Sequence, residues 1–217
     1  MESLVFAMST ETNRHRASQV DPAHAGTAPE PTILAAARSL LNRVLVGHGV
    51  SVRITEVEAY NGPDDPASHA FTRTPRSEIM YGPPNRLYVY QIHTHHCANV
   101  VTSPEGQGSA VLIRAGAVID GVQAARDRRG GVADHLLARG PGNLTRALGI
   151  TKADLDTDLL DPVGVHLLPA DPASDPTTGG HVIAGPRVGV RLAADRPWRF
   201  WIDGEPSVSA YRRHPRA

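Results

Sequence analysis

A strand-forming segment in the first third of the chain constrains the fold more than any other feature. Residues 50–60 read VSVRITEVEAY, in which β-branched residues alternate with polar ones, and the run NGPDDP at residues 61–66 stops the pattern abruptly. Because side chains two positions apart on a strand lie on the same face, Glu56, Glu58 and Tyr60 are expected side by side near the end of this strand. The segment therefore predicts a strand that ends in a group of polar side chains.

Helix and strand patterns on both sides of this segment predict an α+β domain. From residue 31 the spacing of apolar residues is helical, and residues 44–46 turn β-branched before a Gly-His-Gly turn, which predicts a helix that leads into a hairpin. Helices are also expected at 120–128 and 144–148. Strands are expected at 87–92, 97–102 and 110–114, and near 165–168, 187–190 and 199–202. The link His-Thr-His-His joins the strand at 87–92 to the strand at 97–102. We expect a single domain over residues 31–217, with a curved, mostly antiparallel β-sheet, flanking helices and a protruding β-hairpin. Residues 1–30, rich in Ser, Thr, Pro and Ala, are expected to be a flexible leader.

The length and the cysteine content narrow the class of protein. A chain of 217 residues is near the upper end of what one hydrophobic core organises. No apolar run approaches the roughly 20 residues that cross a bilayer, and residues 1–8 lack the basic and apolar regions of a secretory signal. We expect a cytoplasmic monomer without a membrane partner. The single cysteine, Cys97, excludes an intrachain disulfide and a cysteine-rich structural zinc site.

Charge is distributed unevenly along the chain, although the formal net charge is zero. Residues 71–146 hold nine arginines against five acids, residues 187–217 hold seven against three, and residues 151–186 hold one lysine and six aspartates. The two basic segments are expected to form a face for nucleic acid, with the acidic segment turned away. Solvated arginines scattered over the surface are the alternative.

Two carboxylates are the first candidates for catalysis. Glu56 and Glu58 are spaced so that both face the same way, and two carboxylates that flank a bond are what glycoside hydrolysis generally requires. The alternative is an edge strand with two solvated acids.

A row of histidines suggests a second hypothesis, a metal site. His93, His95 and His96 stand beside Cys97, with His69 upstream, and zinc accepts imidazole and thiolate ligands. Paired cysteines, a His-Glu-x-x-His helix and the nucleobase deaminase signature are all absent from the sequence, which argues against this hypothesis.

Four tyrosines, Tyr60, Tyr81, Tyr88 and Tyr90, gather in the middle of a chain with few aromatic residues. Such a set can stack a base that has been turned out of a nucleic acid. Core tyrosines with satisfied hydroxyls are the commoner explanation.

Taken together and in order, these motifs resemble the alkyladenine or 3-methyladenine DNA glycosylase family of vertebrates and bacteria, and the chain looks like a bacterial member. The resemblance covers about residues 32–211 and rests on TEVEAY at 55–60, GP at 62–63, ASH at 67–69, TPR at 74–76, LYVY at 87–90, CAN at 97–99, VLIR at 111–114, GPG at 140–142 with Leu144, and RVGV at 187–190. So many ordered matches are highly specific.

The resemblance implies roles for the matching residues. Glu58 falls on the general base that activates a water, while Arg114 and the main-chain carbonyl of Val188 fall on the groups that hold this water. Arg114 beside Glu58 is expected to favour the ionised carboxylate. No metal ligand and no cofactor is implied.

The resemblance also implies a pocket for a flipped base. Tyr60, His69 and Tyr90 match residues that sandwich and hydrogen-bond this base. Asn99 matches the side chain that obstructs the exocyclic amine of a normal guanine.

The hairpin tip departs from the vertebrate pattern, because His93 replaces a tyrosine that wedges into the minor groove and the link is one residue shorter. His93 is expected to fill the gap that the flipped base leaves, with Thr94 and His95 as alternatives. Tyr88, Arg73 and Arg76 are expected to be further contacts to DNA.

The implied activity is DNA repair. The enzyme would flip 3-methyladenine and 7-methylguanine, with deaminated and etheno purines as further candidates, out of double-stranded DNA at the bacterial nucleoid and hydrolyse the N-glycosidic bond. AP lyase activity is not expected, since it needs an amine nucleophile and the only lysine, Lys152, lies in an acidic segment. A DNA-binding module with a dead pocket and a His-ligated metal-dependent hydrolase are the alternatives.

Overall fold

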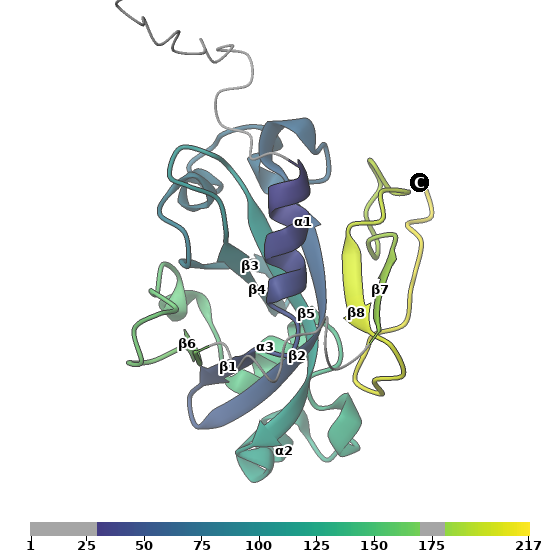
Figure 1. Cartoon of the computed structure of the whole chain (residues 1–217). Helices are drawn as coiled ribbons and strands as arrows, with labels where there is room; N and C mark the ends of the chain where they lie inside the picture. Colours follow the sequence, from purple (N-terminus) through teal and green to yellow (C-terminus); the bar gives the residue numbers. More distant parts are fainter. Residues whose placement is uncertain (1–29, 170–180) are drawn as a thin grey trace, which may run out of the picture.

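An antiparallel β-sheet organises the chain (Figure 1). The computed structural model describes residues 30–169 and 181–217. Within them the sheet has eight strands in the order β3-β4-β5-β2-β1-β6, while β8 pairs with β2 and with β7. The strands are β1 Val44–Gly47, β2 Val50–Tyr60, β3 Leu87–Ile92, β4 His95–Val101, β5 Ala110–Asp120, β6 His166–Leu167, β7 Val182–Gly185 and β8 Arg199–Ile202. The predicted α+β class is confirmed, and the predicted flexible leader lies outside the described residues except for residue 30.

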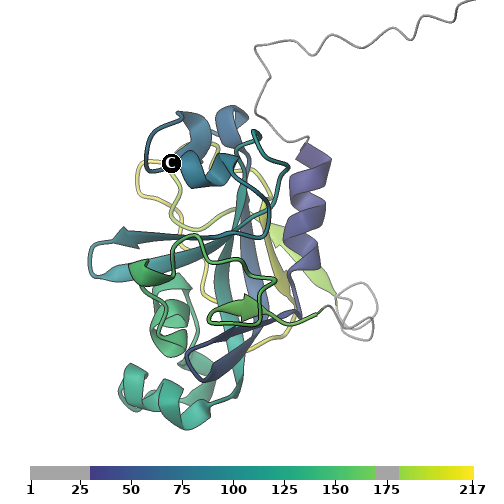
Figure 2. The ribbon, with the colours of Figure 1, turned by 90° about the vertical axis from the view of Figure 1, so that its left-hand side faces the viewer.

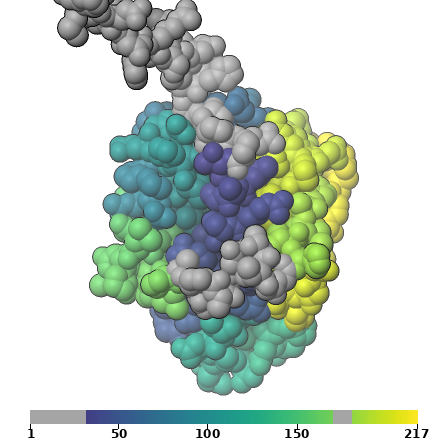
Figure 3. All heavy atoms as spheres, in the orientation of Figure 1, coloured from purple at the N-terminus to yellow at the C-terminus, as the bar shows by residue number. Residues whose placement is uncertain are grey.

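Helices cover the sheet from different sides. The α-helices are α1 Glu30–Ser39, α2 Val122–Arg129 and α3 Pro141–Leu148. Figure 2 shows α1 on one side of the central strands and α3 on the other. In the space-filling view the outer side of α1 lies open at the surface, with a middle part of the chain (blue to teal) on its left and the C-terminal part (yellow) on its right (Figure 3). No helix among the described residues combines the length and the apolar character needed to cross a membrane.

The hydrophobic core explains why these segments fold together. Ile33 of α1, with Leu40 and Leu41 in the turn after it, is buried with Val52 and Ile54 of β2 in one cluster. This cluster also includes residues of α3. β-Branched residues suit a strand that is packed on its faces, whereas the apolar positions of α1 recur at helical spacing. The hairpin between β1 and β2 closes with His48 and Gly49, both at positive φ, as a two-residue turn of this kind requires.

Two irregularities in the β2–β5 pairing set the direction of the side chains that follow. Ile54 pairs with Gly116, but Glu56 pairs with Ala115, so Thr55 is an extra residue on β2. On β5, Arg114 is the extra residue, because the next pair joins positions 57 and 113. Bulges of this kind re-aim side chains. After the bulge, Val57 and Ala59 are the residues of β2 that pack into the core, and Glu56 lies on the opposite face of the strand.

The β3–β4 hairpin projects from the body of the molecule, as predicted (Figure 2). Its turn was predicted as a four-residue link, but β4 already begins at His95, so only His93 and Thr94 form the turn. Residues 91–95 are exposed. The projecting tip is therefore free to meet a large partner.

One predicted strand is wrong. Residues 187–190 form a turn in which Gly189 has a φ of 70°, and the neighbouring strand is instead β7, at residues 182–185. The alternation of valine in this segment resembles a strand pattern, but these residues contact the end of β2 instead of a strand partner.

A single glycine beside the bulge tests this account of the sheet. A Cβ at Gly116 would meet the side chain of Val52 and lie 2.5 Å from the carbonyl oxygen of Arg53. Since overpacking of this kind costs about 1–3 kcal/mol, Gly116→Ala is expected to lower the free energy of unfolding by about that amount in urea titrations. Ala117→Ser, at the next position of β5, is the control and should change it little. Equal stability of Gly116→Ala and the wild type would contradict the close approach of β2 and β5.

Candidate active site

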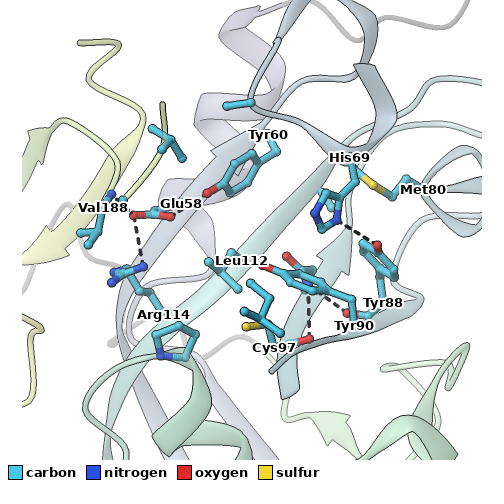
Figure 4. Close-up of a pocket in the computed structure, with 17 residues that line it drawn as sticks. Glu58, Tyr60, His69, Met80, Tyr88, Tyr90, Cys97, Leu112, Arg114 and Val188 are labelled. Atoms are coloured by element: carbon cyan, nitrogen blue, oxygen red, sulfur yellow. Dashed lines mark hydrogen bonds and ion pairs between the residues drawn. The ribbon is translucent and has the colours of Figure 1, made fainter. Parts of the chain in front are cut away.

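A cavity of about 240 Å³ lies where β2, β3, β4 and β5 converge (Figure 4). Its volume is slightly below the 300–1,000 Å³ range of sites for drug-sized ligands, so it suits one small planar group. It brings together eight of the predicted site residues: Glu58, Tyr60, His69, Tyr88, Tyr90, Asn99, Arg114 and Val188. Figure 4 shows the acidic and basic groups on one side of this cavity and the imidazole with two phenol rings on the other.

Glu58 is the most closely held group of the cavity. Its Oε1 accepts a hydrogen bond from the backbone N–H of Val188 at 2.7 Å and lies 3.5 Å from Nη1 of Arg114. Its Oε2 accepts the hydroxyl of Tyr60 at 2.9 Å. The carboxylate is thus fixed by one main-chain donor, one cation and one phenol.

Glu56 is buried too, but it turns away from the cavity. Its Oε1 lies 2.6 Å from Nε of Arg199 and 3.0 Å from Nε of Arg114, and it accepts the hydroxyl of Ser209 at 3.0 Å. Both Glu56 and Glu58 have an exposed fraction of 0%, and β2 lies inside the sheet. The alternative of two solvated acids on an edge strand is therefore wrong.

An internal ion pair supports the floor of the site. Nη2 of Arg187 lies 2.9 Å from Oδ1 of Asp65, and both side chains are fully buried. The guanidinium of Arg187 lies 4.7 Å from the ring centre of Tyr60. A cation beneath an aromatic ring holds that ring in place. The pair also fixes the turn that ends β2, because Asp65 accepts the backbone N–H of Asn61.

The aromatic side of the cavity is built from η3 (His69–Phe71) and β3. The ring centres of His69 and Tyr90 are 4.5 Å apart in an edge-to-face arrangement. The hydroxyl of Tyr88 lies 3.0 Å from Nδ1 of His69, and Nη2 of Arg76 lies 3.2 Å from its Nε2. Because a guanidinium only donates, Nε2 is the acceptor and Nδ1 carries the proton.

Burial in this cavity shifts the pKa of its imidazole and phenol groups. Burial and, to a smaller extent, the charge of Arg76 lower the pKa of His69 to about 4, so this imidazole is neutral at physiological pH. Burial also raises the pKa of Tyr60 and Tyr90 above that of a free phenol. The aromatic side of the cavity is thus uncharged near neutral pH.

Asn99 stands at the side of the cavity where β4 meets β5. Its Nδ2 donates to the carbonyl oxygen of Tyr88 at 3.0 Å, which fixes the amide plane. Cys97, two residues earlier on the same face of β4, also lines the cavity. The sequence suggested it only as a metal ligand beside the histidines, not as a residue of the base pocket. The two-residue spacing from Asn99 was the signal that could have found it.

Ile92 was missed as well. It lines the mouth of the cavity at the end of β3 and is 45% exposed. His93, at the next position, has a φ of 51° and does not line the cavity. An exposed isoleucine in a polar hairpin tip was the sequence signal for this position.

Three other predicted residues lie elsewhere. Tyr81 is buried in a separate cluster and donates its hydroxyl to the carbonyl of Ala70, so it is a core tyrosine. Arg73 pairs with Glu78 outside the cavity, while Arg76 reaches the rim at His69. Across residues 30–169 and 181–217, no three histidine, cysteine or acidic side chains come together as metal ligands.

Several arginines of the two basic segments are held by partners within the protein. Arg128 and Arg129 donate to backbone carbonyls, and Arg126 pairs with Asp134. Arg187 and Arg199 are buried. Counting arginines along the sequence therefore overestimates the charge that is free for a nucleic acid.

Comparison with known proteins shows the family of this chain. The family model described as Methylpurine-DNA glycosylase (MPG) matches residues 28–206. A protein of Mycolicibacterium paratuberculosis with the name "Putative 3-methyladenine DNA glycosylase" is 52% identical over 190 residues, which cover 84% of this chain and 90% of the relative. Proteins with the same name from Mycobacterium bovis and Nocardia farcinica are each 49% identical over 85% and 84% of this chain, and over 92% and 88% of their own length. This chain belongs to the methylpurine-DNA glycosylase family.

Proposed function

We propose that residues 31–217 form a monofunctional DNA glycosylase that flips a damaged purine out of double-stranded DNA and hydrolyses its N-glycosidic bond. The observation that carries this proposal is the position of Glu58, fixed by Arg114 and Val188 beside an aromatic cavity of the size of one base. The enzyme would act as a monomer, and its substrate would place it at the nucleoid in the cytoplasm.

Glu58 would activate the attacking water. A carboxylate offers about four acceptor positions, and three partners occupy Glu58, so about one position remains for a water. Arg114 and the carbonyl of Val188 would hold this water as further partners. The N-glycosidic bond breaks through a sugar with oxocarbenium character, and a carboxylate shielded from solvent stabilises that positive charge strongly.

The aromatic groups would bind the flipped base. Tyr60 comes from β2, whereas His69 and Tyr90 come from η3 and β3, so a base could enter between them (Figure 4). Stacking a base on an aromatic ring contributes about 1–3 kcal/mol, which offsets part of the lost pairing and stacking in the duplex. Asn99, fixed by its bond to β3, would obstruct the exocyclic amine of a normal guanine.

The proposed substrates are 3-methyladenine and 7-methylguanine, with hypoxanthine and ethenoadenine as further candidates. The two methylated bases are cationic in DNA and leave without an acid, whereas a neutral base must first be protonated. The neutral imidazole of His69 suits both classes, because it adds no positive charge that would repel a cationic base.

Lyase activity is not part of the proposal. Lys152, the only lysine, is exposed in η6 (Lys152–Asp154) and does not line the cavity. The abasic product should therefore remain uncut until it is treated with alkali, and borohydride should trap no adduct with the protein.

Glu58→Gln tests the proposal directly. A glutamine keeps the shape but cannot act as a base, so single-turnover release of base should fall by at least about 100-fold, while binding to lesion DNA is retained. The substrates are duplexes with one hypoxanthine or ethenoadenine, and alkylated genomic DNA, all in EDTA. Glu105→Gln makes the same chemical change at an exposed position outside the cavity and should leave release unchanged.

Full activity of Glu58→Gln would contradict the mechanism. Duplex binding by the wild type without release from any substrate would indicate a DNA-binding module instead. Loss of wild-type activity in EDTA would indicate a metal-dependent hydrolase.

The hairpin tip should act on flipping more than on bond cleavage. Ile92 is apolar and exposed at the cavity mouth, and apolar side chains serve as wedges between bases. Ile92→Ala and His93→Asn are expected to lower the flipped fraction of ethenoadenine roughly 3- to 10-fold, measured by its fluorescence in stopped flow. Asparagine tolerates the positive φ at position 93.

Leu160→Ala is the control for the tip, because it removes an exposed apolar side chain that does not line the cavity. Flipping equal to that of the wild type in both tip variants would refute the role of the tip.

A further inference from the structure

We propose that Ser209, together with Glu56 and Arg199, positions Arg114 for the reaction, so that Ser209 is a positioning residue that acts through Arg114. This inference rests on the proposed function of Glu58. It assigns a task to the second carboxylate of β2 and to a residue near the C-terminus that the family match, which ends at residue 206, does not include.

Glu56 takes no direct part in the proposed reaction, because it is fully buried and does not line the cavity. Arg199, Arg114 and the hydroxyl of Ser209 all reach Oε1, and the backbone N–H of Ser209 donates to Oε2 at 2.7 Å. These four partners hold the carboxylate away from the cavity, which Glu56 does not line. Water, sugar and base bound in the cavity would therefore not reach Glu56.

Ser209 connects the charged groups. Its hydroxyl oxygen accepts a hydrogen bond from Nε of Arg114 at 3.1 Å, and its carbonyl oxygen accepts one from Nη2 of Arg199 at 2.9 Å. Ser209 thus contacts both arginines as well as Glu56, through its side chain and its main chain.

These contacts anchor the Nε edge of the Arg114 guanidinium, while its Nη1 faces Glu58. Nε is held by Glu56 and Ser209, whereas Nη1 points to Glu58 at 3.5 Å. Without this anchor Arg114 could move toward Glu58 and form a closer ion pair, which would occupy the carboxylate that must bind the water. Arg114 also sits at the β5 bulge, where no regular strand pairing fixes its backbone.

The same C-terminal segment reaches the loop at Val188. The backbone N–H of Gly189 donates to the carbonyl oxygen of Arg212 at 2.9 Å. Residues 209–212 therefore touch both groups that hold Glu58, Arg114 from one side and the loop from the other. Small displacements of such groups are costly, since a shift of about 1 Å can lower a rate about 100-fold.

The test compares three variants in single-turnover release of hypoxanthine from a duplex. Ser209→Ala removes the hydroxyl and should lower the rate about 10-fold, with the Kd for lesion DNA unchanged within about 2-fold. Ser209→Thr keeps the hydroxyl and should retain most of the rate. Ser207→Ala is the matched control, because the Ser207 hydroxyl bonds to Thr55 and Glu205 and not to the site.

A second measurement separates positioning from stability. Lysine has no Nε edge to anchor, so in an Arg114→Lys background Ser209→Ala should change the remaining rate by less than about 2-fold. The same loss in both backgrounds, or equal rates of Ser209→Ala and the wild type, would overturn the positioning role while leaving the proposed function intact. A wild-type protein that binds the duplex but releases no base would overturn both.

Discussion

Arg114 lies between two buried carboxylates, and the architecture of the site depends on how this one cation is shared. Glu56 and Glu58 have no exposed surface, so each must be paired with positive charge or donors, and breaking a buried pair generally costs about 3–5 kcal/mol. Arg114 and Arg199 together neutralise the charge of the two acids. Nε of Arg114 lies 3.0 Å from Oε1 of Glu56, whereas its Nη1 lies 3.5 Å from Oε1 of Glu58, so Arg114 is 0.5 Å closer to Glu56. Glu56 is thereby held away from the cavity, whereas Glu58 faces it and, in the proposed mechanism, binds the water. Two bulges in the β2–β5 pairing make this arrangement possible, because they bring Arg114 and both acids to one side of the sheet.

Part of the high arginine content serves the interior of the protein, where Arg114, Arg187 and Arg199 are buried. The planar guanidinium of such a residue binds two or more acceptors at once. Arg187 with Asp65 fixes the turn after β2 and contacts the ring of Tyr60, so the proposed base pocket depends on a fully buried ion pair. The same use of arginine that stabilises the fold also orients the site. DNA affinity would then come from a few rim and tip residues and would depend on salt.

Local patterns in the sequence were sufficient for α1, for the strand at residues 50–60 and for the shared face of Glu58 and Tyr60, because periodicity reports burial directly. The bulge residues Thr55 and Arg114 could not be found in this way, since a bulge is a mismatch between strands that are far apart in the sequence. The segment at 187–190 was misread as a strand for a related reason. Its contribution to the site is a main-chain N–H, and no side-chain pattern encodes a backbone donor. The contact of Ser209 with Glu56 joins residues 153 positions apart and was equally hidden.

The most direct test of the account is a crystal structure of the Glu58→Gln protein with a duplex that carries one ethenoadenine. The lesion is expected to lie between Tyr60 and the His69–Tyr90 pair. A water is expected about 3 Å from the side chain at position 58, facing the anomeric carbon. Arg114 should keep its contacts with Glu56 and Ser209. A base that stays stacked in the duplex, or a sugar that faces Glu56 instead of position 58, would contradict the central claim.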